Sequence, residues 1–229
     1  MYTPIHNRET DRAKIIAFMR EYPFATLVTT RDGNMTATHL PVLIDDQNDQ
    51  VFLTAHLARA NVQWRDFGSA KVQAHDALMI FQEPHAFIST RHYEPAQSGD
   101  QRPSTGDAKG TLQGHLSVPT WNYVAVHAYG APRLLESLDE RLKVVERMVQ
   151  QFEGTLEQFD SLPDDFKQTK ANGIVAFEIC VTRLDARFKL SQDRTRVEQE
   201  RIVQALSARP ENVEFEIGAM MQEKLSWAQ

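Results

Sequence analysis

The stretch FATLVTTRDGNMTATHLPVLI, residues 24–44, decides the fold of this chain. Residues 24–30 carry the β-branched and apolar side chains typical of a strand, and residues 35–44 are predicted as the antiparallel partner. The Asp-Gly pair between them favours a tight hairpin turn. A third strand is expected over residues 51–57. Because no helix separates these three strands, they predict an antiparallel meander and argue against a doubly wound parallel sheet.

The rest of the chain adds further strand signals. We expect β structure at residues 77–82 and 86–89, with Pro84 marking a bend or an edge. Residues 118–135 are predicted as one long strand. Residues 174–181 (IVAFEICV) are almost wholly apolar, which is typical of a central strand.

Helices are predicted outside the strands. Residues 11–22 show apolar side chains at helical spacing, with Thr10 as the expected N-cap. Further helices are expected over residues 138–152, 196–208 and 213–225. About six or seven strands with helices at the ends predict an α+β fold, mainly β, built on an antiparallel barrel with flanking helices.

The length of 229 residues suits one domain, so we expect residues 1–229 to form a single unit with C-terminal helices. Residues 91–117 differ in composition, because they hold four glycines and two prolines and almost no apolar side chains. This composition predicts a long flexible loop insertion.

Charge argues against a general affinity for nucleic acid. The net charge of −6 provides no positive field that could hold DNA or an anionic membrane. Residues 183–201 contain six basic and four acidic side chains, a net charge of +2. They are the best candidate for a DNA contact, but no helix-turn-helix pattern supports one. DNA binding is therefore possible but unsupported by composition.

The compartment is predicted from three features. Cys180 is the single cysteine and cannot form an internal disulfide. The first residues lack the basic start and apolar stretch of a signal peptide, and no apolar run approaches the length of a membrane span. We therefore expect a cytoplasmic protein without a membrane partner.

The sequence lacks the motifs of several enzyme classes. The sequence has no HExxH, no paired cysteine ligands and no GxSxG elbow, and it has neither a phosphate loop nor a GxGxxG turn. We therefore predict no metal site and assign no catalytic residue.

Polar residues embedded in apolar strands point instead to a small-ligand pocket. His39 interrupts the strand TATHLPVLI, and His56 ends the strand VFLTAHL. After His56, Arg59 and Asn61 precede an expected helix start, an arrangement that suits a phosphate. Each of these residues could equally be a hydrogen-bonded core residue or part of an ordinary connection.

Two later segments show the same ambiguity. In VPTWNY, Trp121 could form a flat wall against a planar ring, and Asn122 could bond its heteroatoms. In FKLSQDR, Lys189, Ser191 and Gln192 could hold an anion. The alternatives are core aromatics and a solvated helix start.

Five segments in this order closely resemble the PaiB family of FMN-binding negative transcriptional regulators: FATLVTTRDGNMTATHLPVLID, HLARANVQW, IFQEPHAFIST, VPTWNYVAVHAYG and FKLSQDR. The resemblance covers nearly the whole chain, and VPTWNYVAVHAYG and HLARAN are its most specific parts. Residues 91–117 depart from the family, because the link between the IST and VPTWNY segments is longer than usual.

The resemblance implies a split β-barrel of the kind shared with pyridoxamine-phosphate oxidases. It implies a homodimer that holds FMN at the subunit interface. It places Thr38, His39 and Leu40 beside the isoalloxazine ring, and His56, Arg59 and Asn61 toward the ribityl phosphate. The remaining implied ligands close the site from the same or the partner subunit: Trp121, Asn122, Lys189, Ser191 and Gln192.

Three functions follow from the resemblance. The first is a flavin-binding regulator, which is the family's usual description. The second is a flavin-dependent oxidoreductase, in which His39 is a candidate proton donor near the flavin. The third is a haem-binding split barrel with a histidine as axial ligand.

Overall fold

The computed structural model describes residues 1–67, 77–93, 118–208 and 213–226. Within these ranges the strands form a six-stranded sheet in the order β1-β10-β7-β6-β2-β3 and a four-stranded sheet in the order β4-β5-β9-β8. The strands are β1 (Arg8–Glu9), β2 (Phe24–Arg31), β3 (Asn34–Pro41), β4 (Leu43–Gln47), β5 (Gln50–Ala58), β6 (Ala77–Ile88), β7 (Thr120–Gly130), β8 (Pro132–Leu135), β9 (Ile174–Cys180) and β10 (Arg183–Lys189).

The helices and the compact units complete the description. The helices are η1 (Ile5–Asn7), α1 (Arg12–Glu21), η2 (Val62–Asp66), η3 (Thr90–His92), α2 (Leu138–Glu153), α3 (Glu157–Ser161), α4 (Asp164–Asn172), α5 (Arg196–Ser207) and α6 (Val213–Ser226). Unit 1 consists of residues 1–3, 9–82 and 125–186, and unit 2 of residues 4–8, 83–124 and 187–229. β6, β7 and β10 contribute residues to both. A single domain over the whole chain stays a prediction.

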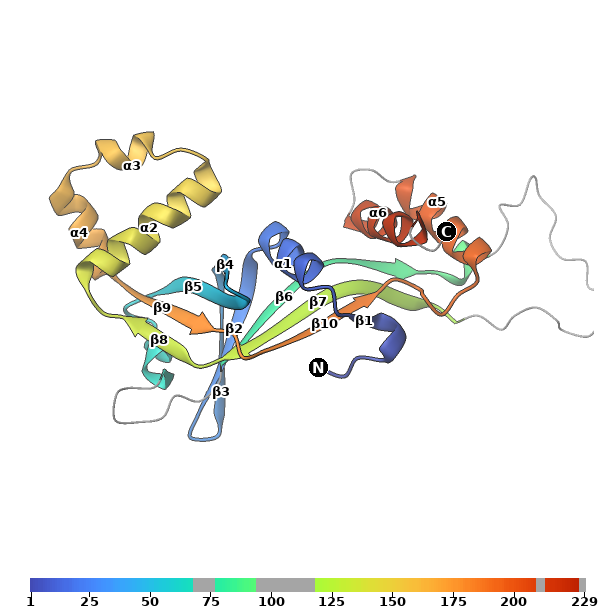
Figure 1. Cartoon of the computed structure of the whole chain (residues 1–229), viewed down its shortest axis with the longest axis horizontal. Coiled ribbons are helices and arrows are strands. Elements are labelled where there is room, and N and C mark those ends of the chain that lie inside the picture. The colour runs from blue at the N-terminus through green and yellow to red at the C-terminus, as the bar shows by residue number, and fades with distance from the viewer. Residues whose placement is uncertain (68–76, 94–117, 209–212, 227–229) are drawn as a thin grey trace, which may run out of the picture. The chain divides into compact units, whose positions relative to one another are not determined.

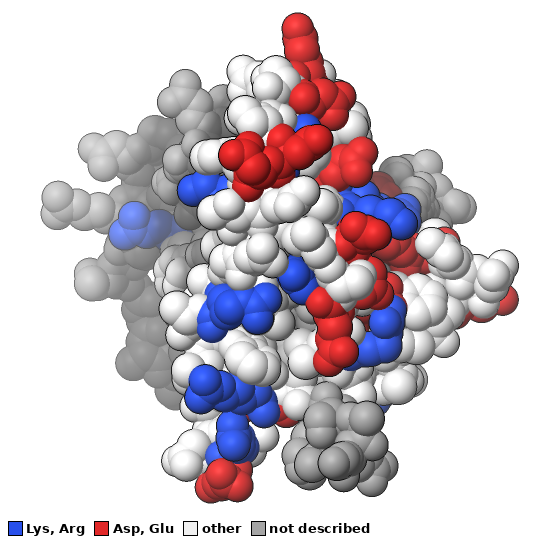
Figure 2. Space-filling view, turned by 90° about the vertical axis from the view of Figure 1, so that its left-hand side faces the viewer, with Lys and Arg blue, Asp and Glu red and all other residues white. Residues whose placement is uncertain are grey.

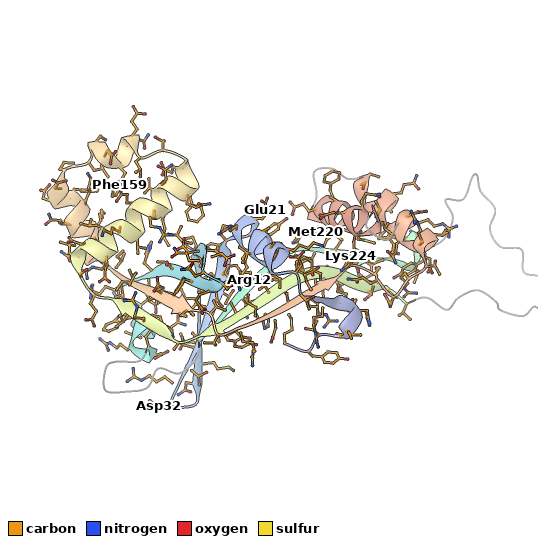
Figure 3. All side chains as sticks on the ribbon, viewed as in Figure 1. Arg12, Glu21, Asp32, Phe159, Met220 and Lys224 are labelled. Carbon is orange, nitrogen blue, oxygen red and sulfur yellow. The ribbon has the colours of Figure 1, made fainter. Side chains whose placement is uncertain are left out.

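The hairpin in unit 1 forms as its sequence predicts. β2 and β3 pair antiparallel from Phe24 opposite Pro41 to Arg31 opposite Asn34. Asp32 and Gly33 both have positive φ angles, 51° and 80°, which is the geometry that a two-residue hairpin turn requires. The turn projects from the rest of unit 1, with Asp32 at its tip (Figures 1 and 3).

Two strands that the sequence predicts as continuous are broken in the structure. Residues 35–44 belong to β3 and β4, which lie in different sheets. The break falls at Val42, whose N–H donates to Pro23 O (3.0 Å) rather than to a neighbouring strand. Residues 118–135 likewise divide into β7 and β8 at Ala131. In both cases a proline, which has no N–H, adjoins the break and weakens the ladder there.

The four-stranded sheet carries the buried centre of unit 1. β9 lies between β5 and β8, which confirms that residues 174–180 form a central strand. Leu53, Phe177 and Ile179 have no exposed surface. α2 packs against β4, β5 and β9 and ends at Gly154 in the left-handed conformation, as the sequence predicts.

Some local predictions are wrong. Asp11, not Thr10, caps α1, because its carboxylate accepts from Ala13 N (2.9 Å) and Lys14 N (3.3 Å). Residues 77–82 and 86–88 belong to one continuous strand, β6, with Pro84 inside it; β6 pairs with β2 over residues 78–80, so a bend or an edge at Pro84 stays a prediction. The structure contains ten strands in the described ranges rather than six or seven.

The structure also contains elements that the sequence did not predict. α3, α4 and β10 are short and polar, so their patterns are weak. After β8 the chain runs through α2, α3 and α4 before it returns as β9 (Figure 1). Phe159 lies between these three helices (Figure 3), with Lys167 Nζ 5.2 Å from its ring centroid.

Acidic side chains are concentrated on helices α3 and α4. The first turns of α3 and α4 hold Glu157, Asp160, Asp164 and Asp165. Figure 2, which looks onto the end of the molecule where these helices lie, shows Asp and Glu side chains in its upper part. Within the described ranges, no helix has the length and apolar character needed to cross a membrane.

Unit 2 contains the two predicted C-terminal helices. α5 begins with a capping box formed by Thr195 and Glu198, and it packs against α6 through Leu206 and Ile217, which are buried. Residues 91–93 lie in and directly after η3, and the rest of the predicted 91–117 loop lies outside the described residues.

Gly130 is required by a close approach of two backbones. A Cβ built there lies 2.2 Å from Cys180 O and 2.8 Å from Ile179 Cγ2. We expect Gly130→Ala to lower the free energy of unfolding by about 2–3 kcal/mol or more, because the backbone must shift to relieve the overlap. Gly154→Asn is the control, since asparagine tolerates the left-handed conformation. Equal unfolding free energies for the two variants in urea would contradict this prediction.

Candidate functional site

The predicted site residues divide between the two units. Thr38, His39, Leu40, His56, Arg59 and Asn61 belong to unit 1, and Trp121, Asn122, Lys189, Ser191 and Gln192 belong to unit 2. Each group is therefore described by itself.

In unit 1 the structure brings Thr38 and Asn61 together. Asn61 Nδ2 donates to Thr38 Oγ1 (2.9 Å), and Asn61 Oδ1 accepts from Gln63 N (3.0 Å). Asn61 is thus the N-cap of η2 and also an anchor for β3. One side chain links the segment after β5 to the hairpin.

Gln63 strengthens this link, and the sequence analysis did not identify it. Its side chain is buried, and Nε2 donates to Leu27 O (3.3 Å), Thr29 Oγ1 (3.1 Å) and Thr36 O (3.1 Å). These acceptors come from both β2 and β3. A lone glutamine between two apolar residues gives no sequence signal for such a role.

β3 presents an open edge. It lies at the end of the six-stranded sheet, so among the described strands only β2 pairs with it through backbone hydrogen bonds. Leu40 is buried, Thr38 is half-buried and His39 is exposed. Outward backbone N–H and C=O groups on such a strand are available to a ligand or to another strand.

His56 lies on β5 opposite Ala176 of β9 and is half-buried. Its Nδ1 is buried and has no hydrogen-bond partner among the described residues. Burial lowers the pKa of the His56 imidazole, because a charged ring would lose its hydration there. His56 is therefore neutral at neutral pH.

Arg59 binds backbone carbonyls at the end of α4. Its Nε donates to Asn172 O (2.7 Å) and its Nη2 to Ile174 O (2.8 Å). The expected helix start after it is the five-residue 3₁₀ helix η2, in which the N–H of Gln63 donates to the side chain of Asn61. This geometry fits an ordinary connection, and a phosphate role for Arg59 stays a prediction.

A pocket of about 210 Å³ adjoins Arg59 in unit 1. Sequence reasoning missed it, because its walls come from three stretches of the chain: residues 59–64, residues 134–141 and Val175. The lining residues are Arg59, Trp64, Leu134, Leu135, Glu136, Arg141 and Val175.

In unit 2 the buried polar residues satisfy one another. Asn122 and Ser191 are buried, and Ser191 Oγ donates to Asn122 Oδ1 (3.0 Å). Asn122 Nδ2 donates to the sulfur of Met221 on α6 (3.3 Å). Gln192 stabilises the turn in which it lies, because its Oε1 accepts a hydrogen bond from Leu190 N (2.7 Å). These side chains hold the turn after β10 in place.

Trp121 and Lys189 remain closer to solvent. Trp121 is 52% exposed, and its ring centroid lies 5.8 Å from that of His85 and 5.6 Å from that of Phe87. Lys189 Nζ donates to Trp121 O (2.7 Å) and to Thr120 Oγ1. Burial lowers the pKa of Lys189, and nearby Arg187 lowers it further. Unit 2 therefore offers an aromatic surface beside an ammonium group.

The buried imidazole predicts a pH effect on stability. The unfolded chain takes up a proton at His56 below about pH 6.5 more readily than the folded chain, so stability falls as the pH falls. The quantity to measure is the difference in unfolding free energy between the wild type and His56→Gln. We expect this difference to become smaller as the pH is lowered from about 7.5 to 5, by at most about 1.4 kcal/mol per pH unit. Exposed His6→Gln is the control. A pH-independent difference for His56→Gln would contradict the assignment.

Comparisons with known proteins follow this geometry. A family model described as "Putative FMN-binding domain" matches residues 1–183. The chain is 32% identical over 228 residues to "Protease synthase and sporulation protein PAI 2" of Bacillus subtilis, and the match covers 98% of each protein. An uncharacterized protein of Emericella nidulans is 24% identical and covers 84% of this chain and 85% of its own length.

Solved structures share the fold at low identity. An FAD and haem binding protein from Mycobacterium smegmatis has a TM-score of 0.55 at 11% identity and covers 80% of this chain and 73% of its own. The flavocytochrome Anf3 from Azotobacter vinelandii has a TM-score of 0.54 at 11% identity, with 82% and 69% covered. The two-sheet arrangement is thus the antiparallel split barrel that the sequence predicted. With the family model matching most of the chain and the Bacillus subtilis relative matching nearly all of it, this protein belongs to the PaiB family of FMN-binding proteins.

Proposed function

We propose that the chain binds FMN along the open edge of β3 and acts as a flavin-dependent regulatory protein. The observation that carries the cofactor part is the Asn61–Thr38 hydrogen bond at an unpaired sheet edge. Thr38, His39 and Leu40 form the proposed contact strand, with His56 and Asn61 as further members of the site.

The unit 1 groups fit the chemistry of the cofactor. An isoalloxazine ring has an apolar face and an edge of alternating hydrogen-bond donors and acceptors, and the outward backbone groups of β3 alternate in the same way. Gln63 and Asn61 hold this strand still, which reduces the ordering cost of binding. Bound FMN supplies hydride and one-electron chemistry, and the chain's residues orient it.

In unit 2, Trp121 and Lys189 are the proposed contacts. Trp121 offers a flat exposed ring, and Lys189 is a cation with one N–H left after its two bonds to Thr120 and Trp121. Asn122, Ser191 and Gln192 are proposed to position these two residues, since their own polar atoms bond inside unit 2.

The regulatory role is supported by the family resemblance and by the sporulation name of the Bacillus subtilis relative. The acidic net charge favours regulation without direct DNA contact. We propose a homodimer, supported by the open β3 edge and by Met35 on it, which is 80% exposed. A cytoplasmic location is supported by the single cysteine and by the soluble composition.

A flavin-dependent oxidoreductase is the second candidate. The exposed imidazole of His39 on the proposed contact strand favours it, because a histidine there could hold or deliver a proton. The absorption spectrum of the purified protein separates both flavin functions from a haem-binding one.

The cofactor site is tested by titration with FMN. We expect the wild type to bind FMN at micromolar concentrations and Thr38→Val to bind about five- to tenfold more weakly, because the Asn61 bond that fixes the strand is lost. Thr36→Val, which alters an exposed side chain on the same strand, is the control. Trp121→Ala should also bind more weakly, by about tenfold, if its ring stacks on the flavin. Absence of binding by the wild type would overturn the cofactor site.

The two functions are separated by anaerobic mixing of the FMN-loaded protein with NADH or NADPH. A regulator should leave the flavin oxidised over minutes, whereas an oxidoreductase should bleach its absorption band. In parallel, a mobility-shift assay at low and high salt should show no salt-sensitive DNA binding. Rapid bleaching would favour the oxidoreductase, and a salt-sensitive shift would contradict regulation without DNA contact.

A further inference from the structure

We propose that the pocket beside the end of α4 is a second ligand site, which takes a small monocarboxylic acid with a flat apolar body. The pocket has a volume of about 210 Å³ and lies within unit 1. Its two arginines, one glutamate and one tryptophan stand around an aliphatic wall of Leu134, Leu135 and Val175.

Both guanidinium groups are held in place before any ligand arrives. Arg59 is fixed by Asn172 O and Ile174 O. Arg141 Nε donates to Ala171 O (3.0 Å), and its Nη2 donates to Asn172 Oδ1 (3.0 Å). Arginines fixed in this way lose little side-chain entropy when they bind an anion.

The charge of the lining selects an anion. Arg59 and Arg141 contribute two positive charges and Glu136 one negative charge, which leaves the lining with a net charge of +1. Both arginines already donate hydrogen bonds to carbonyl groups near the end of α4. The positive charge that remains to attract a ligand therefore suits a monoanion better than a dianion. A cation would have to displace or overcome two guanidinium groups.

The apolar part of the pocket selects the body of the ligand. Trp64 is oriented by the bond from its Nε1 to the backbone O of Arg59 (3.2 Å), and the guanidinium carbon of Arg65 lies 5.5 Å from the centroid of its ring. A flat ring can pack on Trp64 and on the aliphatic wall while its carboxylate meets Arg59. The volume of about 210 Å³ accommodates one ring with its carboxylate and is smaller than an FMN molecule.

The pocket is distinct from the proposed FMN contacts, because Thr38, His39, Leu40, His56 and Asn61 do not line it. The assignment also gives Arg59 a carboxylate partner in place of the predicted phosphate. It does not rest on FMN binding, so the two sites are tested separately.

The test titrates the full chain with three probes of one shape: benzoate, benzamide and benzamidine. We expect benzoate to bind one-to-one below about 10 mM in calorimetry and to shift the Trp64 indole N–H resonance. Benzamide, which lacks the charge, should bind at least about tenfold more weakly. Binding of benzamidine with equal or higher affinity would overturn the proposal, and so would tighter binding of inorganic phosphate than of benzoate.

Variants of the lining make the test specific. Glu136→Gln should raise benzoate affinity by about three- to tenfold, because it removes the one negative charge of the lining. The Glu136 side chain is exposed, and its backbone O still accepts from Arg141 Nη1. Glu157→Gln, an exposed glutamate outside the pocket, is the matched control. Leu134→Trp should abolish binding by filling the cavity. Unchanged benzoate affinity in Leu134→Trp, or weaker affinity in Glu136→Gln, would refute the site.

Titration of FMN into the benzoate-loaded protein separates the two sites. We expect FMN to bind without displacing benzoate. Competition between the two would overturn the second site and leave FMN binding intact, whereas benzoate binding without any FMN binding would overturn only the proposed cofactor site.

Discussion

The buried carboxamide of Gln63 holds together the part of unit 1 on which the candidate sites depend. Its Nε2, which has two hydrogens, lies within donating distance of three acceptors on β2 and β3 and so links the segment after β5 to the hairpin. Leaving a buried amide without hydrogen-bond partners costs more free energy than the bonds contribute to stability. The Gln63 side chain therefore resists separation from the hairpin. Asn61 adds a second attachment at Thr38, on the strand that carries the proposed flavin contacts.

The same short connection contributes residues to both proposed ligand sites. Asn61 and Gln63 act on β3, whereas Arg59 and Trp64 line the pocket beside α4. Arg59 also ties the connection to the end of α4 through two backbone carbonyls. A carboxylic acid in the pocket would therefore act on the segment that positions the proposed flavin strand.

The candidate site residues fall into two groups. Some form hydrogen bonds with other parts of the chain, and others are exposed and can contact a ligand. Asn122 and Ser191 satisfy each other in the interior of unit 2, as buried polar groups must. Trp121 keeps half of its surface exposed. The family resemblance predicts a place near a flavin for all three residues. Their contacts suggest that Asn122 and Ser191 position the site, whereas the Trp121 ring is exposed enough to contact a ligand.

The sequence by itself determined the hairpin, the central strand 174–180, the long helix α2 and the family, because turn chemistry, apolar runs and helix caps act over a few residues. The points at which the chain leaves one sheet for the other, Val42 and Ala131, became visible only in the tertiary structure, since strand-forming residues lie on both sides of each break. The tertiary structure also decided the roles of Gln63 and Arg141. Their partners lie some 30 residues away in the chain, where no local pattern records them.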